Sequence, residues 1–306
     1  MASAQAKWRP AMGRSIPALL LTPAGLILTA LVAVPLALLV VSSFTNFGQR
    51  SLFTGEFDMV GLDQYAAVFR TPDFVMALLR TLVFAATLIT GSVLIGMAVA
   101  QMMTKLRPGL RYLVTFALIC AWAMPNVASS MVWKWMFQPG YGVVNWMLTQ
   151  LRVFGDVTDL SWSNDTALSF ACIWMLVVWQ AVPYIAITLY AATQQIDPSV
   201  LEAARVDGAG ETRTYWHVVV PMLAPTIMVV TMLSIIWDFN VFNQVWLVSQ
   251  GGPDETTATV AVFTYKQAFV NFDIGHGAAI SVLTVFILLA LTGLYIRNLL
   301  KSGEEL

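Results

Sequence analysis

Asp238 is an acidic residue deep inside a long apolar run of the chain. The run begins near Met222, so Asp238 follows about 16 residues later, which is roughly 24 Å along an α-helix. A charge at such depth in a bilayer is costly, and the side chain is expected to face the interior of a bundle or water. A carboxylate there can accept hydrogen bonds from a polar solute. This placement predicts a path for a polar molecule through a membrane.

A second stretch, residues 196–225, combines acidic, basic and small residues within an otherwise apolar chain. Asp197 is a favourable N-cap, the proline after it suits the first helical position, and Gly208 suits a helix stop. A second helix is predicted from Glu211 to Val220, before another proline. Each helix has about ten residues, fewer than the roughly 12 to 15 at which isolated helices become marginally stable in water. Another structure must therefore hold the pair.

The remaining reactive residues form no recognisable catalytic or metal site. His217 and His276 are far apart in sequence, and both are expected in loops. Neither lies at metal-ligand spacing from Cys120 or Cys172, which are expected to be buried as small hydrophobic residues. The sequence contains no G-x-x-x-x-G-K-[ST] phosphate loop. The chain is therefore expected to hold no cofactor and to perform no bond chemistry, and any nucleotide-driven work must come from another subunit.

The composition indicates an integral membrane protein. Hydrophobic residues make up 58% and charged residues 11% of the 306-residue chain, and the mean hydropathy is +0.74. Soluble globular domains usually have about 25% charged residues. The net charge of −1 argues against a nucleic-acid partner, which usually requires a basic surface. The lipid bilayer is the partner that this composition predicts.

Six long apolar runs predict an all-α protein with six transmembrane helices in one domain, residues 16–306. The predicted spans are 16–44, 74–103, 110–136, 166–193, 222–248 and 278–300. The first is longer than the roughly 7 to 15 residues of a signal-peptide core, so it is expected to be retained after an N-terminal segment, residues 1–15. Pro125 is expected to break the third span, and Pro183 lies inside the fourth. A short interfacial helix is predicted around Val143 to Leu151.

The distribution of basic residues predicts the orientation, because short positively charged loops stay in the cytoplasm. A cytoplasmic N-terminus places most of the 16 Lys and Arg residues on that side. These are Lys7, Arg9, Arg14, Lys105, Arg107, Arg111, Arg205, Arg213, Arg297 and Lys301. Both termini and residues 196–221 then lie in the cytoplasm, whereas most acidic loop residues face outward.

Several motifs follow one another in a recognisable order. Glu202-Ala203-Ala204 is followed by Asp207-Gly208-Ala209, and Trp216 and Pro221 lie nine and fourteen residues after Asp207. The other motifs are Gln195-Ile196-Asp197-Pro198, Trp237-Asp238-Phe239-Asn240-x-Phe242, Gly251-Gly252-Pro253, and Tyr265-x-x-Ala268-Phe269 with Gly277-Ala278-Ala279. This set, within residues 174–285, resembles the permease subunits of binding-protein-dependent ABC importers. It is most similar to the branch with the maltose, trehalose and glycerol-phosphate permeases, and its first motif resembles their EAA loop.

The resemblance implies a type I importer permease fold with a cytoplasmic coupling helix pair at residues 196–221. In that family the pair sits in a groove of a cytoplasmic ATPase. The implied coupling residues are Glu202, Ala203, Ala204, Asp207, Gly208 and Trp216. The glutamate would pair with a basic residue of the ATPase, the alanines would permit close approach, the glycine would provide the turn, and the tryptophan would anchor the second helix. The alternative is that the charges of this loop form only a solvated face.

The resemblance also implies partners and a location. The chain would be half of the translocation pathway in the cytoplasmic, or inner, membrane. Its expected partners are a second homologous permease, two cytoplasmic ATPase subunits that bind ATP and Mg, an extracytoplasmic solute-binding protein and a sugar substrate, di- or oligosaccharide-like. ATP-driven closure of the ATPase pair would open the bundle outward, and hydrolysis would return it inward.

A substrate path is implied on the fourth and fifth spans by the same resemblance. Its residues are Gln180, Ala181, Tyr184, Ser234, Trp237, Asp238 and Asn240. Carboxylates, amides and hydroxyls can hydrogen-bond sugar hydroxyls, and aromatic rings can stack on a sugar face. Ordinary packing is the alternative for Trp237 and Tyr184, and interhelical hydrogen bonding is the alternative for Asn240, Asn243 and Gln244. Asp238 could instead pair with a basic residue of another subunit.

Two rival functions stay open on the sequence alone. An ion-coupled secondary transporter would use Asp238 as a proton or sodium site, and uptake would then depend on an ion gradient and not on ATP. A purely structural membrane anchor is the third reading. Co-purification of a soluble ATPase that is lost when Glu202 and Gly208 are changed would exclude both.

Overall fold

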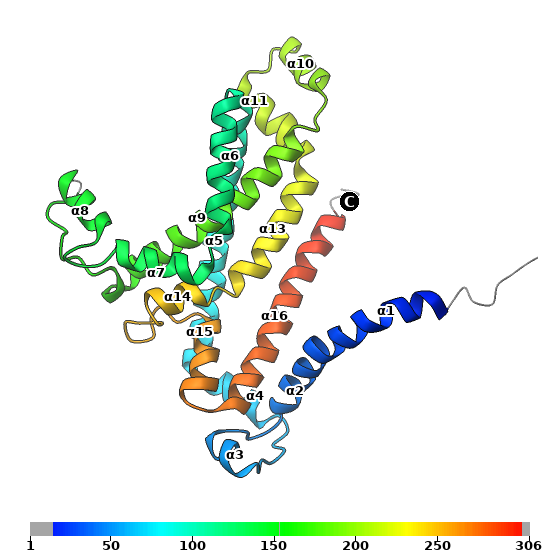
Figure 1. Cartoon of the computed structure of the whole chain (residues 1–306), viewed down its shortest axis with the longest axis vertical. Coiled ribbons are helices and arrows are strands. Elements are labelled where there is room, and N and C mark those ends of the chain that lie inside the picture. Colours follow the sequence, from blue (N-terminus) through cyan, green and yellow to red (C-terminus); the bar gives the residue numbers. More distant parts are fainter. Residues whose placement is uncertain (1–14, 153, 302–306) are drawn as a thin grey trace, which may run out of the picture. The chain divides into compact units, whose positions relative to one another are not determined.

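The computed structural model describes residues 15–152 and 154–301. Residues 1–14 of the predicted N-terminal segment, with Lys7, Arg9 and Arg14, lie outside the described residues. The helices are α1 (Ser15–Leu28), α2 (Val34–Ser42), α3 (Gln49–Thr54), α4 (Asp63–Arg70), α5 (Pro72–Lys105), α6 (Pro108–Ala123), α7 (Asn126–Met136), α8 (Val143–Gln150), α9 (Thr166–Thr193), α10 (Pro198–Val206), α11 (Glu211–Thr214), α12 (Val220–Met222), α13 (Ala224–Phe239), α14 (Asn243–Val248), α15 (Val260–Tyr265) and α16 (Ile274–Lys301) (Figure 1).

Irregular helical stretches join some of these elements. Thr29–Ala33, Tyr215–Val219 and Lys266–Val270 are π-helical, and Trp162–Asn164 is a 3-10 turn. The described part of the chain has no strand beyond an isolated β-bridge between Thr45 and Met59. The all-α prediction is therefore confirmed for these residues.

Four of the described helices are each long and apolar enough to cross a bilayer. They are Leu20–Ser42, Pro72–Lys105, Thr166–Thr193 and Ile274–Arg297. Two further helix pairs reach this length only together: Pro108–Ala123 with Asn126–Met136, bent by 100°, and Glu211–Met222 with Ala224–Phe239, bent by 72°. The described residues therefore provide four candidate spans, or up to six if each bent pair is one span.

The chain divides into two compact units, residues 1–68 with 267–282, and residues 69–266 with 283–306. In the second unit α5 packs along α9, α6 packs against α9, and α13 packs against both α5 and α9. Leu88, Ile173 and Leu176 are fully buried at the centre of this packing. The second unit contains both functional stretches predicted from the sequence.

The first unit is held by a small set of hydrogen bonds around its loops. Ser43 Oγ and Tyr65 Oη are 2.7 Å apart, and Gln64 Nε2 donates to Thr45 O at 3.0 Å. Gly275 N donates to Phe47 O at 2.7 Å, which joins the start of α16 to the loop before α3. The last two of these bonds satisfy backbone groups of the loop.

The structure has a helix break at one position where the sequence predicts it, and it differs from the prediction at two others. The break predicted at Pro125 is confirmed by the 100° bend between α6 and α7. The predicted run 222–248 is not one helix, because α13 ends at Phe239 and α14 begins at Asn243. The second loop helix does not end before Pro221 but continues to Met222.

The π-helical stretch explains why the helix continues through Pro221. A proline inside an α-helix lacks a donor and clashes with the carbonyl four residues before it. Just before this proline the helix widens, and Val220 N donates to Tyr215 O, five residues earlier. Such a widened turn provides space for the ring. The bend then falls at Leu223 and not at the proline.

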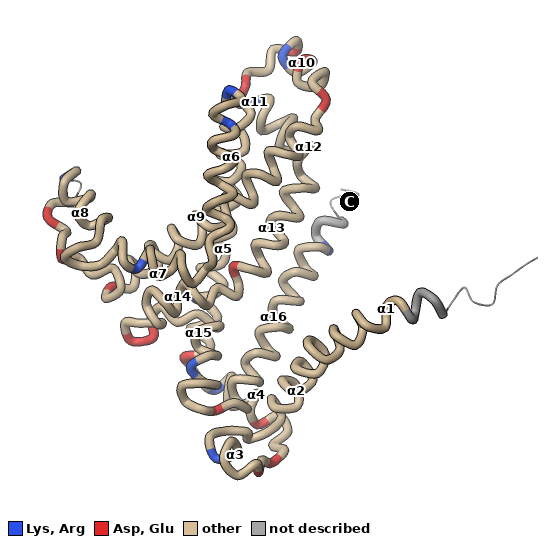
Figure 2. Tube along the Cα trace, viewed as in Figure 1, with Lys and Arg blue, Asp and Glu red and all other residues tan. Residues whose placement is uncertain are grey.

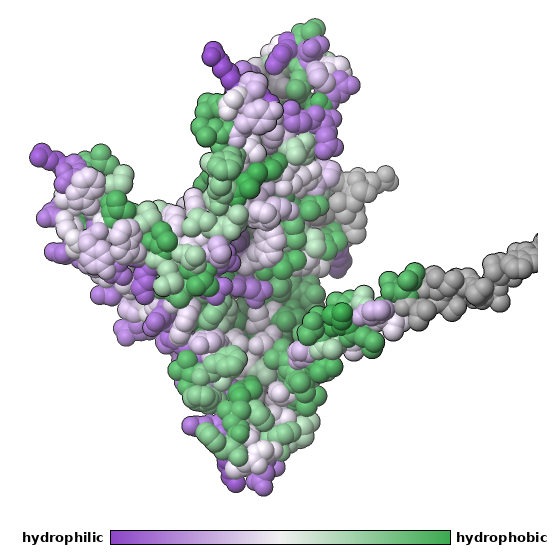
Figure 3. All heavy atoms as spheres, viewed as in Figure 1, coloured by the Kyte–Doolittle hydropathy of each residue, from purple (hydrophilic) through white to green (hydrophobic). Residues whose placement is uncertain are grey.

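Charged residues and apolar surface are distributed as expected of a membrane protein. Lys, Arg, Asp and Glu gather in loops and near helix ends, including the α10–α11 region (Figure 2). Hydrophobic side chains dominate the visible surface of α16, whereas hydrophilic ones surround α10 (Figure 3). The predicted interfacial helix at Val143 to Leu151 is present as α8, Val143–Gln150.

Candidate functional site

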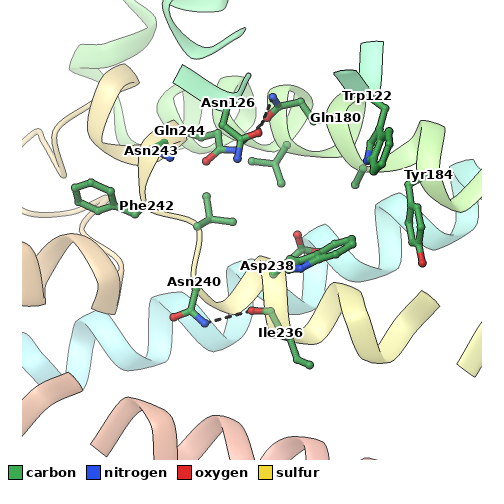
Figure 4. A pocket seen from close by; sticks show the side chains of 14 residues that line it. Trp122, Asn126, Gln180, Tyr184, Ile236, Asp238, Asn240, Phe242, Asn243 and Gln244 are labelled. Atoms are coloured by element: carbon green, nitrogen blue, oxygen red, sulfur yellow. Dashed lines mark hydrogen bonds between the residues drawn. The ribbon is translucent and has the colours of Figure 1, made fainter. Parts of the chain in front are cut away.

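A cavity of about 550 Å³ opens in the second unit, among α6, α7, α9, α13 and the segment that enters α14 (Figure 4). Its polar lining residues are Asn126, Gln180, Asp238, Asn240, Asn243 and Gln244, and its aromatic ones are Trp122, Tyr184, Trp237 and Phe242. The two helix breaks, at Pro125 and at Asn240–Phe242, both lie beside it. Non-helical backbone at membrane depth is tolerated where it borders a polar cavity, which is the situation here.

The structure brings together nearly all the residues predicted for the substrate path. Gln180, Ala181, Tyr184, Trp237, Asp238 and Asn240 line the cavity. Ser234 does not line it, because it lies one turn before Asp238 on α13 and is buried in the packing. The predicted set is therefore one contiguous site with that single residue outside.

Asp238 is the buried charge of this site. Its side chain lies in the last turn of α13, and the residue is only 6% exposed. The Oδ2 atom is buried and has no hydrogen-bond partner among the described residues. The C-terminal end of a helix carries partial negative charge, so the local backbone does not stabilise the carboxylate. A water or a bound molecule could donate to this oxygen.

Aromatic rings form one wall of the cavity. The ring of Tyr184 is 5.5 Å from that of Trp237 in an edge-to-face arrangement and 6.2 Å from that of Trp122 in a stacked one. These residues come from α9, α13 and α6. Tyr184 and Trp237 therefore pack against each other, and both rings also line the cavity.

A chain of amides lines the cavity next to the aromatic rings. Gln244 Nε2 donates to Gln180 Oε1 at 2.9 Å, and Gln180 Nε2 donates to Asn126 Oδ1 at 3.2 Å. The interhelical bond expected for Gln244 is confirmed, whereas Asn240 Nδ2 donates to Ile236 O, in the last turn of the preceding helix α13, at 3.2 Å. Three helices are joined by amides that remain at the cavity wall (Figure 4).

Among the polar and aromatic residues that line the cavity, Trp122 and Asn126 were not predicted from the sequence. A usable signal was present for Asn126, since it is a polar residue directly after the helix-breaking Pro125 within an apolar run. Trp122 gave no comparable signal, because a tryptophan in an apolar run is ordinarily packed or interfacial.

The predicted loop helix starts and stops as expected. Asp197 accepts a hydrogen bond from Ser199 N at 2.9 Å and caps α10. Hydrogen bonds from Ser199 hold the pKa of the Asp197 carboxyl below its ordinary value. At the other end Gly208 has a φ of +78°, Gly208 N donates to Arg205 O, and Ala209 N donates to Ala204 O, both at 3.0 Å. This is the Schellman arrangement that glycine favours.

The predicted coupling residues present an accessible surface. Glu202, Ala203, Asp207 and Gly208 are exposed, Ala204 is half-buried, and Trp216 is 50% exposed in the π-helical stretch. Their accessibility leaves them available to a partner.

The loop is also tied to the neighbouring helix. Glu211 Oε2 lies 2.5 Å from Lys105 Nζ, at the end of α5. Both side chains are largely exposed, so this ion pair contributes little to stability, about 0–1 kcal/mol.

Other sequence predictions have mixed outcomes. Cys172 is buried as expected, but Cys120 is exposed on α6, because that helix has no residue buried within the described chain. His276 is not in a loop but in the first turn of α16, where it is buried. The described residues contain no group of three or more His, Cys, Asp or Glu side chains that could hold a metal ion.

Comparison with known proteins gives the family. The family model described as "binding-protein-dependent transport system inner membrane component" matches residues 92–302. The chain is 36% identical over 293 residues to the diacetylchitobiose uptake system permease protein DasB of Streptomyces coelicolor, covering 96% of this chain and 89% of that protein. It is 28% identical over 291 residues to the sulfoquinovosyl glycerol transport system permease protein SmoG of Agrobacterium fabrum, covering 95% and 92%.

The fold is also shared with a solved transporter. A chain of the bacterial alginate ABC transporter, in complex with an alginate pentasaccharide-bound periplasmic protein, matches with a TM-score of 0.79 at 18% identity, over 92% of each chain. The fold is thus that of an ABC importer permease. The chain belongs to the family of binding-protein-dependent transport system inner membrane components and is a multi-pass permease of the cytoplasmic membrane.

Proposed function

We propose that this chain forms half of the translocation pathway of an ATP-driven importer for a di- or oligosaccharide-like sugar. The cavity beside Asp238 is the observation that carries this proposal. It joins a carboxylate and several amides to four aromatic side chains, and these groups can hydrogen-bond sugar hydroxyls and stack on a sugar face. The names of the two relatives, which refer to diacetylchitobiose and to sulfoquinovosyl glycerol, support a sugar as the cargo.

A second homologous permease would complete the pathway. Asn240, just after α13, is exposed at the cavity, and Trp237, in the last turn of α13, is 50% exposed. An uncovered amide in lipid is unfavourable, which supports a protein surface opposite it. Six spans, with both termini in the cytoplasm and residues 16–306 as one domain, complete the proposed architecture. The alginate transporter in complex with its periplasmic protein supports delivery of the cargo by an extracytoplasmic binding protein.

Residues 196–221 would couple this half to one of two cytoplasmic ATPase subunits, where ATP and Mg bind. The exposed face of α10, with Glu202 and the neighbouring alanines, would enter a groove of the ATPase. Gly208 would set the turn, and Trp216 would anchor the second helix. Movement of this pair would bias the bundle between inward-open and outward-open states, since coupling requires contacts that differ between states.

The family does not favour the two rival functions. ABC importers use a separate ATPase, so an ion-coupled transporter based on Asp238 is not supported. A membrane anchor would have no need of a polar cavity at membrane depth, which is costly to maintain.

Charge reversal at Glu202 tests the coupling role. We expect Glu202→Lys to lower sugar-stimulated ATP hydrolysis by about tenfold or more in the reconstituted importer, within the range of usual coupling energies. The membrane bundle should stay folded, because Glu202 is exposed and joins no buried network. Glu56→Lys, the same change at an exposed glutamate of another loop, is the matched control and should leave hydrolysis unchanged. Normal coupling in the Glu202 variant would refute the assignment.

A further inference from the structure

The lining of the cavity contains an acidic side chain and no basic one among the described residues. Among the described residues that line it, Asp238 is the only one with a formal charge, and no Lys, Arg or His is among them. The family leaves the charge of the cargo open, since its fold includes a transporter for alginate, an acidic polysaccharide. Any preference of this transporter for the charge of its cargo must therefore come from the residues that line its own cavity.

The carboxylate of Asp238 is poorly compensated by its own chain. Oδ2 is buried without a partner, and the nearby amides of Gln180, Gln244 and Asn126 hydrogen-bond one another. Electrostatic interactions strengthen as water is excluded, so the ionised form of this group would repel a nearby anion. A hydroxyl or an ammonium group would instead supply the missing donor.

The position of Asp238 brings this charge close to a bound sugar. In Figure 4 Asp238 lies on α13 across the cavity from Gln180, and Tyr184 and Trp122 lie to the right of both. A sugar ring stacked on these aromatic side chains would place its substituents beside the carboxylate. The Asp238 carboxylate would then interact directly with a charged substituent of the sugar.

From these features we propose that Asp238 acts as a charge filter. It accepts neutral sugars and sugars with a protonated amine, and it rejects sugars with carboxylate, sulfonate or phosphate groups. The inference rests on the proposed sugar pathway and adds the charge class of the cargo.

Three β-1,4-linked trisaccharides of equal length test the filter: cellotriose, the glucosamine trimer and the mannuronate trimer. Their binding to the purified importer in nanodiscs is measured by tryptophan fluorescence, since Trp122 and Trp237 line the cavity. We expect the mannuronate trimer to bind at least about tenfold more weakly than the other two, because like charges at a contact are costly. Added salt should narrow the gap.

Two asparagine variants separate the filter from general effects of charge. In Asp238→Asn the gap should fall to about threefold or less, since the repulsive charge is gone. Asp254→Asn removes one exposed carboxylate outside the cavity and should keep the gap. Asparagine also tolerates the left-handed backbone at position 254, where φ is +45°.

The remaining outcomes each overturn the proposal. Equal binding of the three trimers, or an unchanged gap in Asp238→Asn, removes the filter and leaves the importer function intact. Loss of the second permease from the purified Asp238→Asn complex would show that Asp238 pairs with that subunit. If no trimer binds, the cavity is not a sugar site, and ATP-driven sugar uptake by the same complex then decides whether the importer function survives.

Discussion

At the residue scale, Gly208 is the position where backbone geometry requires one residue type. Its φ of +78° lies in the left-handed region, and a Cβ at this position would meet no atom within 4 Å. Space is therefore not the constraint. The conformation itself disfavours other residues, by about 1–2 kcal/mol for an L-residue with a side chain.

This geometry predicts the effect of Gly208→Ala. We expect amide protection at Gly208 and Ala209, which donate the two closing hydrogen bonds, to fall about 5- to 30-fold in hydrogen exchange. Retention of the ATPase during purification should fall as well, because the loop no longer holds one shape. Gly210→Ala is the control, since its φ of −68° is ordinary and its surroundings are equally open. Equal effects of the two changes would show that the left-handed turn is not what matters.

The site residues differ in how well their positions and contacts could be predicted from the sequence. The depth of Asp238 was evident, because an acid in an apolar run is conspicuous on energetic grounds alone. Its lack of a partner was not, since this depends on where the amides of Gln180 and Gln244 point. Ser234 shows the converse: a small polar residue one turn away on the same helix faces the packing and not the cavity.

At the element scale, the α5–α9 contact organises the second unit. A Cβ added at Gly96 would lie 2.5 Å from Ile185 Cγ2 and 2.9 Å from Ile185 Cβ. Ile185 is 1% exposed and belongs to a buried cluster between these helices. Glycine here permits close approach of the two backbones, as is common for small residues between membrane helices.

Replacement of Gly96 with alanine should therefore destabilise the bundle. We expect a loss of about 1–3 kcal/mol in the free energy of unfolding, because neither helix can move apart freely. Combining it with Ile185→Ala should cost less than the sum of the two single changes, since the second change removes Cγ2, the closer of the two clashing atoms. Gly293→Ala on α16 is the control, because a Cβ there meets nothing within 4 Å. Strict additivity in unfolding titrations would show that the helices adjust without strain.

The helix breaks show how far local sequence determines an element. Pro125 predicted its break, since proline removes a donor and clashes with the preceding turn. Pro183 lies within the continuous helix α9, so the same residue type does not always break a helix. The break at Asn240–Phe242 contains neither proline nor glycine, and it is set by packing of α14 against α7 and α9. Such packing between helices cannot be predicted from the periodicity of the sequence.

At the scale of the whole molecule, family membership leaves the orientation of the chain as a prediction from its basic residues. Two exposed positions suit a direct test, since Phe154 and Val206 lie beyond opposite ends of α9. Phe154 is 73% exposed and Val206 is 86% exposed. The intervening helix has 28 residues, or roughly 42 Å, which is enough to cross a bilayer. The two positions should therefore face different compartments.

Single cysteines at these positions should report opposite sides of the membrane. In a background with Cys120 and Cys172 replaced, we expect Phe154→Cys to react with a membrane-impermeant maleimide in intact cells. Val206→Cys should react only in inverted vesicles, because the basic loops keep that end in the cytoplasm. Labelling of both after detergent lysis is the control for reactivity. Labelling of both from one side would mean that α9 does not span the bilayer, whereas a reversed pattern would place residues 196–221 outside, where no ATPase could couple to them.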